Sequence, residues 1–291
     1  MKKVSDILNE KERTFSFEFF PPRTDKGYKN LLRHVAELAA LQPDFISCTY
    51  GAGGGNREKT FDIVQRIQQE HAIPGIAHLT CVLNTKNEIL NILNDIKARG
   101  ICNVLALRGD PPQDNPDWQP GPENFEYSYQ LCRFIREHFS DYFGIGVAGF
   151  PEGHPLCPDK EKDANFLKLK LDSGGDFVIT QFFWDNKDYF AYTRRLRQRG
   201  ITARVIPGIF PFTDYEKMKS FADKDGIRIT PEIKELFEPI QDDKEKTLSA
   251  VIDFTVRRAR ELLAGGAPGL HFYTLNKSHP VDEIVKQIKA S

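Results

Sequence analysis

The sequence predicts a (β/α)8 barrel, and three observations support this fold class. Eight short apolar segments alternate with amphipathic segments of helical length. This alternation is typical of a parallel sheet, because each parallel strand pair needs a long crossover. The chain has 291 residues, which accommodates eight such units at the usual barrel size of about 250 residues. No linker or change of composition divides the chain, so we expect a single domain over residues 1–291; a doubly wound open sheet is the alternative.

Each predicted strand is short, bounded by turn residues, and rich in β-branched or aromatic side chains. The strands are expected at Thr14–Phe20, Asp44–Tyr50, Gly75–Val82, Asn103–Leu107, Gly144–Phe150, Phe177–Phe183, Ala203–Ile209 and Gly269–Leu275.

The segments between these strands repeat apolar residues at helical spacing. Phe61, Val64 and Ile67 lie on one face of such a segment. Glycine ends several of these segments, as at Gly100 and Gly200, because it tolerates the left-handed conformation that closes a helix. Helices are expected over 29–41, 60–71, 86–99, 125–138, 161–173, 187–199, 214–223 and 281–289, with a pair of helices over 231–264.

Charge and composition exclude several classes of protein. The 40 basic and 41 acidic side chains leave no basic excess of the kind that nucleic-acid-binding proteins carry. The five cysteines form no C-x-x-C pair, which argues against a zinc ribbon and favours a reducing compartment. No signal-peptide core and no membrane-length apolar run is present. We therefore expect a cytoplasmic protein that binds neither nucleic acid nor membrane.

One predicted connection is unusually long. The segment from Gly109 to Glu123 contains five prolines and no helical pattern. Connections of this length are uncommon and often form functional lids. A rigid surface excursion is the other interpretation.

Polar residues interrupt the apolar pattern where the predicted strands end. Both faces of a barrel strand are covered, so its residues should be almost entirely apolar. Barrel enzymes place their chemistry at the C-terminal ends of the strands, and the sequence therefore predicts an active site there. The polar residues at these ends are Glu18, Thr49, His78, Arg108, Asp110, His154, Gln181, Tyr273 and Lys277.

Glu18 lies within a run of phenylalanines. A buried carboxylate is costly unless it is paired or protonated. One interpretation is a buried ion pair, and the other is a general acid whose pKa is raised by the surrounding phenylalanines. Arg108 and Asp110 likewise form either an ordinary surface pair or two functional charges at a strand end.

Other nucleotide-binding, metal-binding and catalytic motifs are weak or missing. The glycine-rich segment that begins at Gly51 fails the G-x-G-x-x-G pattern because position 56 is Asn. It still allows a ligand to approach the backbone closely. The sequence has no Walker A motif, no H-E-x-x-H and no G-x-S-x-G, and its histidines lack metal-ligand spacing. We therefore predict no metal site.

Seven blocks of the sequence, in order, resemble the signature blocks of the methylenetetrahydrofolate reductase family. They extend from residue 16 to residue 277 and so cover nearly the whole chain. They are Ser16–Arg23, Thr49–Ala52, His78–Cys81, Leu105–Asp110, Pro151–Pro155, Ile179–Phe183 and His271–Asn276.

The resemblance implies a barrel that binds FAD and reduces 5,10-methylenetetrahydrofolate to 5-methyltetrahydrofolate in one-carbon metabolism. It implies NADH or NADPH as the reductant in a ping-pong scheme, and a homo-oligomer. Glu18 would be the general acid that protonates folate N10 and opens the ring to an iminium cation. Asp110 would lie near the flavin and the pterin and would stabilise that cation. The length matches the bacterial form, which has only the catalytic barrel.

The remaining site residues follow from the same resemblance. Arg108 and Lys170 would contact the flavin phosphates. Phe150 and Lys277 depart from the family pattern, in which Tyr and Arg are usual. The implied flavin-binding residues are Thr49, Tyr50, Ala52, His78, Arg108, Gly109, Asp110, Tyr127, Ser128, Phe150, His154, Asp163 and Lys170. The implied substrate-binding residues are Glu18, Asp110, Gln181, Phe221, Tyr273 and Lys277, of which Phe221 would pack against the nicotinamide.

Two other functions remain open from the residues. A flavin-free barrel lyase or aldolase would use Glu18 and Asp110 as an acid–base pair. A non-catalytic folate- or nucleotide-binding module would bind ligand without oxidising NADH.

Overall fold

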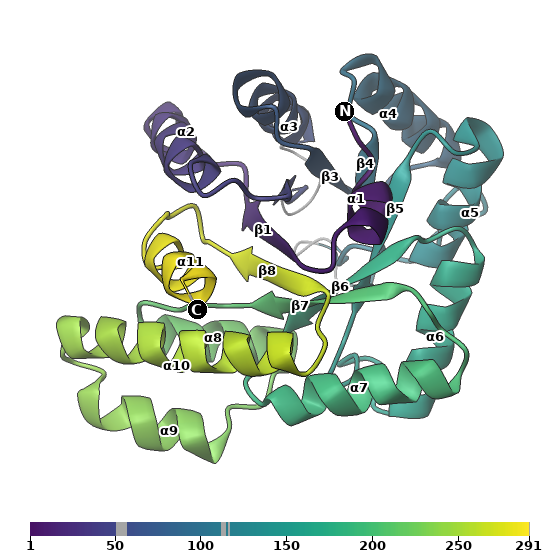
Figure 1. Ribbon diagram of the computed structural model, residues 1–291. Helices are drawn as coiled ribbons and strands as arrows, with labels where there is room; N and C mark the ends of the chain where they lie inside the picture. Colours follow the sequence, from purple (N-terminus) through teal and green to yellow (C-terminus); the bar gives the residue numbers. More distant parts are fainter. Residues whose placement is uncertain (51–56, 112–114, 116, 291) are drawn as a thin grey trace.

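The computed structural model describes residues 1–50, 57–111, 115 and 117–290. Eight parallel strands close into a barrel in sequence order, from β1 to β8 and back to β1 (Figure 1). The predicted fold class and all eight predicted strands are therefore confirmed. The strands are β1 (Thr14–Phe19), β2 (Phe45–Cys48), β3 (Gly75–Thr80), β4 (Asn103–Leu107), β5 (Gly144–Gly149), β6 (Phe177–Phe182), β7 (Arg204–Ile209) and β8 (Gly269–Tyr273).

Helices surround the barrel, and most of the long ones bury an apolar face against the strands (Figure 1). Hydrogen bonds from side chains fix several of their first residues; Thr85 and Glu88, for example, form a capping box. The helices are α1 (Val4–Glu10), α2 (Asp25–Ala39), α3 (Arg57–His71), α4 (Lys86–Ala98), α5 (Ser128–Phe139), α6 (Lys160–Asp172), α7 (Asn186–Gln198), α8 (Tyr215–Asp225), α9 (Pro231–Phe237), the 3-10 helix η2 (Glu238–Ile240), α10 (Lys244–Ala264) and α11 (Val281–Lys289).

The helix that sequence analysis did not predict is α1, which closes the N-terminal end of the barrel. Val4 and Leu8 are fully buried in a cluster with residues that begin or line the strands, such as Phe45 and Phe177. The backbone N–H of Val4 donates to Oδ1 of Asn103 at 2.7 Å. Only seven residues form α1, so its helical period is too short to stand out in the sequence.

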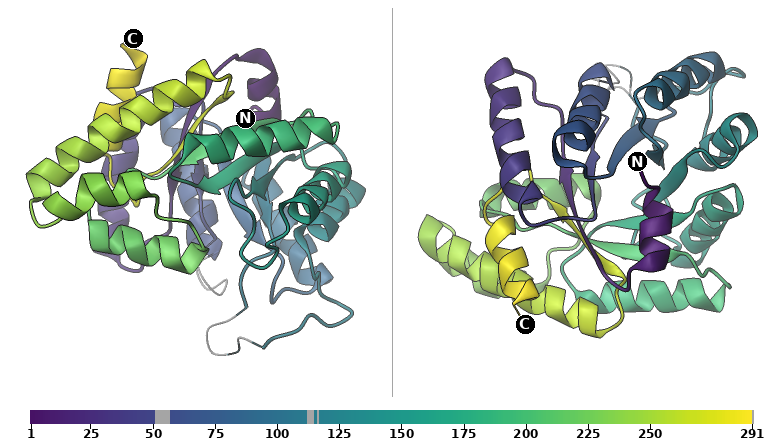
Figure 2. Two further views of the ribbon diagram at one scale, coloured as in Figure 1. Left: turned by 90° about the horizontal axis from the view of Figure 1, so that it is seen from below. Right: turned by 45° about the horizontal axis from the view of Figure 1, so that its top comes forward.

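A separate aromatic cluster joins α8, α9 and α10 to the ends of β6 and β7. Phe182, Trp184 and Phe210 pack against one another, and Phe212 packs against Phe237. This cluster fixes α8 beside the C-terminal ends of β6 and β7. Figure 2 shows α8 and α9 at one side of the barrel, next to α10.

The described part of the proline-rich connection after β4 lies away from the barrel (left view in Figure 2). Its second half is anchored to α4. The backbone N–H of Lys86 donates to Glu123 O at 2.8 Å, and Nδ2 of Asn124 donates to Asn84 O at 3.0 Å. These bonds favour a rigid surface excursion for residues 120–124. Residues 112–114 and 116 of the same segment lie outside the described residues.

Two further observations concern the described residues. None of their helices is long and apolar enough to cross a membrane. All five cysteine thiols are free, and four of them are buried.

Candidate active site

Glu18 lies near the C-terminal end of β1, where its strand neighbours bring polar side chains beside it. In the strand register, Glu18 is opposite Ser47 on β2 and opposite Tyr273 on β8. Two residues earlier on β1, Ser16 is opposite His271. Because side chains two residues apart share one face of a strand, Ser16 and Glu18 both face these neighbours.

Three side chains contact the same oxygen of Glu18. Oγ of Ser47 donates to Oε2 at 3.2 Å. Nε2 of His78 lies 3.2 Å from Oε2, and Nε2 of His271 lies 3.4 Å from it. The Glu18 side chain is 14% exposed and both histidines are buried. The carboxylate therefore retains a narrow opening to solvent while its charge is held by two imidazoles.

The environment of Glu18 lowers its pKa, so the prediction of a raised pKa is wrong. Burial by itself raises the pKa, as the surrounding phenylalanines suggested. The charges and hydrogen bonds of His78 and His271 outweigh burial and lower the pKa to about 2. The two imidazoles beside Glu18 therefore agree with the interpretation of this carboxylate as a member of a buried ion pair.

Ser16, Ser47 and His271 are site residues that sequence analysis did not assign. Oγ of Ser16 lies 2.8 Å from Nδ1 of His271, while Nε2 of the same ring faces Glu18. The imidazole is thereby held from both sides, and it stacks on Phe45. The available signal was the alternation of polar residues at positions 16 and 18 and at 271 and 273.

A second group of predicted residues gathers where β4, β5 and α6 meet. Burial and the charges of Lys170 and Arg108 lower the pKa of His154, and the charge of Asp110 opposes them. These four side chains therefore share one electrostatic environment. The His154 ring packs edge-to-face on Phe150 at 4.5 Å. The nitrogen groups of Lys170, Arg108 and His154 lie near the Phe150 ring. This arrangement fits an anionic ligand that also contains a planar ring.

Two buried ionisable groups lie in this second region. Burial lowers the pKa of Lys170, and the charge of Asp163 opposes that effect. Burial raises the pKa of Asp163 to about 6, although Lys170 and Arg195 lower it. Nζ of Lys170 donates to Ala148 O at 3.1 Å and lies 5.8 Å from the centre of the Phe150 ring. A buried ammonium is costly to maintain without an opposite charge, and the Asp163 carboxyl supplies one here.

The backbone after β4 requires glycine at residue 109, because its φ is positive and a Cβ would overlap neighbouring side chains. Gly109 has φ +84°, and an added Cβ would lie 2.7 Å from Val82 Cγ1 and 2.9 Å from Thr80 Cβ. The adjacent Arg108 donates through Nε to Glu126 O at 3.0 Å. This bond directs Arg108 toward the segment that leads into α5.

Other predicted flavin-binding residues lie at helix starts and loop ends. Tyr127 is 42% exposed and stacks on the partly exposed Phe166, and Ser128 begins α5. Tyr50 is instead buried against Phe61. Thr49 accepts a hydrogen bond at its carbonyl from Thr60. Ala52 lies outside the described residues.

The predicted folate-binding residues surround the ends of β6, β7 and β8. The Tyr273 hydroxyl donates to Thr180 O at 2.7 Å. An added Cβ at Gly208 would lie 2.6 Å from Cε2 of the Tyr273 ring, so this ring needs glycine beside it. Nε2 of Gln181 donates to Oδ2 of Asp225 at 3.3 Å, and Oε1 accepts from the N–H of Phe182.

Asp225 is a further site residue that sequence analysis missed. It is the last residue of α8, four residues after Phe221, so both side chains lie on one face of the helix. Burial and the charge of Asp110 raise its pKa, and Lys224 lowers it. Asp225 therefore interacts with two predicted site residues: it accepts a hydrogen bond from Gln181 and is affected by the charge of Asp110.

The last two predicted substrate residues are exposed. Phe221 is 38% exposed and packs edge-to-face on Phe210 at 5.6 Å. Lys277 is exposed on the loop after β8, and its N–H donates to Thr274 O at 3.0 Å. Across the described ranges, no group of three or more His, Cys, Asp or Glu side chains could hold a metal ion.

Comparison with known proteins places this site in a family. The family model for methylenetetrahydrofolate reductase matches residues 3–289. The chain is 37% identical over 291 residues to methylenetetrahydrofolate reductase 1 of Schizosaccharomyces pombe, covering 98% of this chain and 48% of that protein. It is 36% identical over 264 residues to 5,10-methylenetetrahydrofolate reductase of Escherichia coli, covering 90% of this chain and 86% of that protein. The chain thus spans about half the length of the first relative and most of the second.

A solved structure supports the fold. An uncharacterised protein from Clostridium thermocellum, which binds two copies of 5-methyl-5,6,7,8-tetrahydrofolic acid, superposes with a TM-score of 0.65. The two chains are 16% identical, and the match covers 98% of this chain and 96% of the other. Since the family model covers nearly the whole barrel, including every strand that forms the site, the chain belongs to the methylenetetrahydrofolate reductase family.

Proposed function

We propose that this protein reduces 5,10-methylenetetrahydrofolate to 5-methyltetrahydrofolate with NADH or NADPH, using bound FAD in a ping-pong scheme. The observation that carries the proposal is Glu18, a nearly buried carboxylate held between two imidazoles at the active-site end of a barrel of this family. A protein that only binds folate has no need for a costly buried charge of this kind.

The cofactor part of the proposal depends on the second group of residues. Lys170, Arg108 and His154 would hold the flavin diphosphate, and the exposed Tyr127 offers a flat surface beside them. Gly109 lets the backbone between Arg108 and Asp110 pack closely against Val82 and Thr80, which would hold both charges in place. When bound, FAD would accept hydride from the nicotinamide and deliver it to the methylene carbon of the folate.

The chain's own residues would supply the proton that opens the folate ring. With a pKa of about 2, Glu18 is a carboxylate. Nε2 of His78 lies 3.2 Å from Oε2 and Nε2 of His271 lies 3.4 Å from it. An imidazolium at either position would pass its Nε2 proton to Glu18 and become a neutral imidazole, and the neutral carboxylic acid would then protonate folate N10 as the C–N bond breaks. Asp110 would stabilise the resulting iminium cation through its charge.

The remaining residues would position the substrates. Gln181 and Tyr273 would contact the pterin, Phe221 would pack against the nicotinamide, and Lys277 would bind the glutamate tail. We also propose that the barrel acts as one catalytic domain and assembles as a homo-oligomer in the cytoplasm.

The substitution Glu18→Gln tests the proposed function. The amide is nearly isosteric, so flavin binding should be preserved and the thermal melt should remain cooperative, with a lower midpoint. Stopped-flow absorbance of the flavin should show the folate half-reaction slowed by about 10²-fold or more, since general acids contribute about that much. The NADH half-reaction needs no proton from Glu18 and should change by less than about threefold. Glu70→Gln, which makes the same change on the exposed surface of α3, serves as the control.

Three outcomes contradict the proposal. A correctly folded protein that neither contains FAD nor takes it up excludes a flavoenzyme. Cleavage of a substrate without NAD(P)H would instead support the lyase alternative. Equal losses in both half-reactions of Glu18→Gln would show that Glu18 shapes the pocket without supplying a proton.

A further inference from the structure

The loop that follows β8 holds the end of β1 through the side chain of Asn276. Oδ1 of Asn276 accepts from the N–H of Phe20 at 2.9 Å, and Nδ2 donates to Phe20 O at 2.8 Å. One amide thus pairs with both backbone groups of a residue that lies two positions after Glu18. These two bonds continue the pairing of β1 with β8, whose register ends at Glu18 and Tyr273.

A second residue of the same loop binds Glu18 itself. Oγ1 of Thr274 donates to the backbone carbonyl of Glu18 at 2.6 Å, and the N–H of Thr274 approaches the same oxygen at 3.3 Å. The N–H of Asn276 donates to Oγ1 of Thr274 at 3.2 Å, which links the two contacts. The backbone that follows the Cα of Glu18 is therefore held at two points, the Glu18 carbonyl and Phe20.

The loop holds this geometry in a conformation that side chains rarely adopt. Leu275 and Asn276 have φ of 49° and 60°. Asparagine tolerates the left-handed region, but for leucine it is strained. Such strain persists only where surrounding contacts enforce it, and it is concentrated at functional sites.

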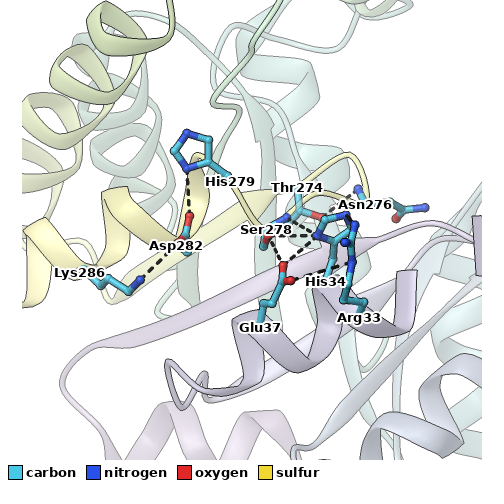
Figure 3. Close-up of polar contacts among 9 residues, drawn as sticks. All are labelled: Arg33, His34, Glu37, Thr274, Asn276, Ser278, His279, Asp282 and Lys286. Atoms are coloured by element: carbon cyan, nitrogen blue, oxygen red, sulfur yellow. Dashed lines mark hydrogen bonds and ion pairs between the residues drawn. The ribbon is translucent and has the colours of Figure 1, made fainter. Parts of the chain in front are cut away.

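Contacts with α2 hold the far end of the loop. Oγ of Ser278 donates to Oε2 of Glu37 at 2.5 Å and lies 3.0 Å from Nδ1 of His34 (Figure 3). Figure 3 shows Asn276 and Thr274 on one side of Ser278 and the α2 residues on the other. The loop is thus fastened at both ends, to β1 and to α2.

We propose that Asn276 is a positioning residue for Glu18: its side-chain amide fixes the backbone at the end of β1 and so sets the distance between the Glu18 carboxylate and the two imidazoles. The catalytic consequence rests on the proposed function, but the effect on Glu18 does not. Without the amide, the end of β1 loses two hydrogen bonds and Glu18 moves relative to His78 and His271.

The substitution Asn276→Gly tests this inference, because glycine accepts φ of 60° and only the amide is lost. The matched control is Gln42→Gly, which removes an exposed amide at φ 53° between α2 and β2. We expect Asn276→Gly to slow the folate half-reaction by about tenfold or more, as small misplacements of catalytic groups do, with its pH profile displaced. The NADH half-reaction and Gln42→Gly should stay within about twofold of the wild type.

A titration that needs no activity separates this inference from the proposed function. In glutamate labelled with ¹³C at the carboxyl carbon, the Glu18 signal is assigned by its loss in Glu18→Gln. Its titration midpoint should move upward in Asn276→Gly, because the carboxylate leaves its imidazole partners. This result in a protein that does not reduce folate would refute the proposed function and retain the positioning role.

Two outcomes overturn the inference. The first is an unchanged Glu18 titration and folate half-reaction in Asn276→Gly. The second is an equal loss in both half-reactions, with Asn276→Asp indistinguishable from Asn276→Gly. Asp keeps the acceptor for Phe20 N–H but loses the donor and places a charged oxygen beside Phe20 O, so a positioning role requires a loss confined to the folate half-reaction. Asn276→Asp also provides the test if the glycine variant does not fold.

Discussion

Four polar side chains around Glu18 replace the apolar residues that normally fill a parallel barrel. Ser16, Ser47, His78 and His271 are all buried and come from four neighbouring strands. Their hydrogen-bonding groups offset the cost of burying a charge. The same contacts keep a proton donor within reach of the carboxylate. Stabilisation of the charge and catalytic function are therefore properties of one cluster.

The lowered pKa of Glu18 predicts how its contribution to stability depends on pH. A carboxyl whose pKa falls from 4.5 to about 2 on folding stabilises the folded state above pH 4.5. That contribution is lost as the pH falls from about 4.5 toward 2. Denaturant unfolding of the wild type and of Glu18→Gln should show the advantage of the wild type shrinking over this range, by up to about 3 kcal/mol. A difference that is independent of pH would contradict the pairing with the imidazoles.

Individual elements reach the active site through their ends. The last two residues of β1, β6 and β8 include Glu18, Gln181 and Tyr273. Arg108 directly follows β4, and Asp225 ends α8. The pairing of β6 with β7 shifts register between Ile179 and Phe182, and Gln181 lies within that irregularity. Irregular pairing of this kind re-aims side chains near active sites. The site therefore depends on how each strand ends rather than on the strand interiors.

Gly109 at the end of β4 provides a test at the scale of one element. Gly109→Ala combines a left-handed φ with contacts below 3.0 Å to Val82 and Thr80. Gly100 at the end of α4 has φ +72° and nothing within 4 Å of an added Cβ. Gly100→Ala should cost about 1–2 kcal/mol of unfolding free energy from backbone strain alone. Gly109→Ala should cost about 1–3 kcal/mol more and should weaken flavin binding, as measured by fluorescence titration with FAD.

The two substitutions separate strain from steric overlap. Equal losses of unfolding free energy would mean that Val82 and Thr80 move away at little cost. In that case the packing of residue 109 against Val82 and Thr80 does not require glycine.

The whole molecule separates stability from chemistry along the barrel axis. The N-terminal end is closed by α1 and an apolar cluster, whereas the C-terminal end carries the polar residues. This is the usual division of labour in a (β/α)8 barrel. This division predicts that a substitution at the N-terminal end lowers stability and leaves the reaction rates largely unchanged.

Leu8→Ala in α1 tests this division. Leu8 is 1% exposed and packs inside the N-terminal end of the barrel. Truncation of a buried leucine should lower the free energy of unfolding by about 2–5 kcal/mol, as measured by urea denaturation. The rates of both half-reactions should remain within about twofold of the wild type while the variant is folded. Asn9→Ala on the exposed side of the same helix is the control. A selective loss of the folate half-reaction in Leu8→Ala would contradict the separation.

The eight strands, nearly all of the helices and the end of the barrel that carries the polar residues could be predicted from the sequence alone. These features depend on local periodicity, on glycines at helix ends and on polar residues at strand ends, all of which can be recognised within a few residues. The helix α1 was missed because seven residues carry too weak a period. The resemblance of seven blocks then indicated the family that the comparisons confirm.

The groups that meet at Glu18 could not be predicted from local patterns, because their contacts form only when the barrel closes. His271 and Glu18 are 253 residues apart in the chain and 3.4 Å apart in the barrel. Their contact depends on the closure of β8 against β1, which no local pattern encodes. The direction of the pKa shift follows from that contact, because burial and imidazole charge act in opposite directions and the balance depends on distance. The same closure places the Asn276 amide on the backbone of Phe20, where an ordinary loop residue of the sequence becomes a support for the carboxylate.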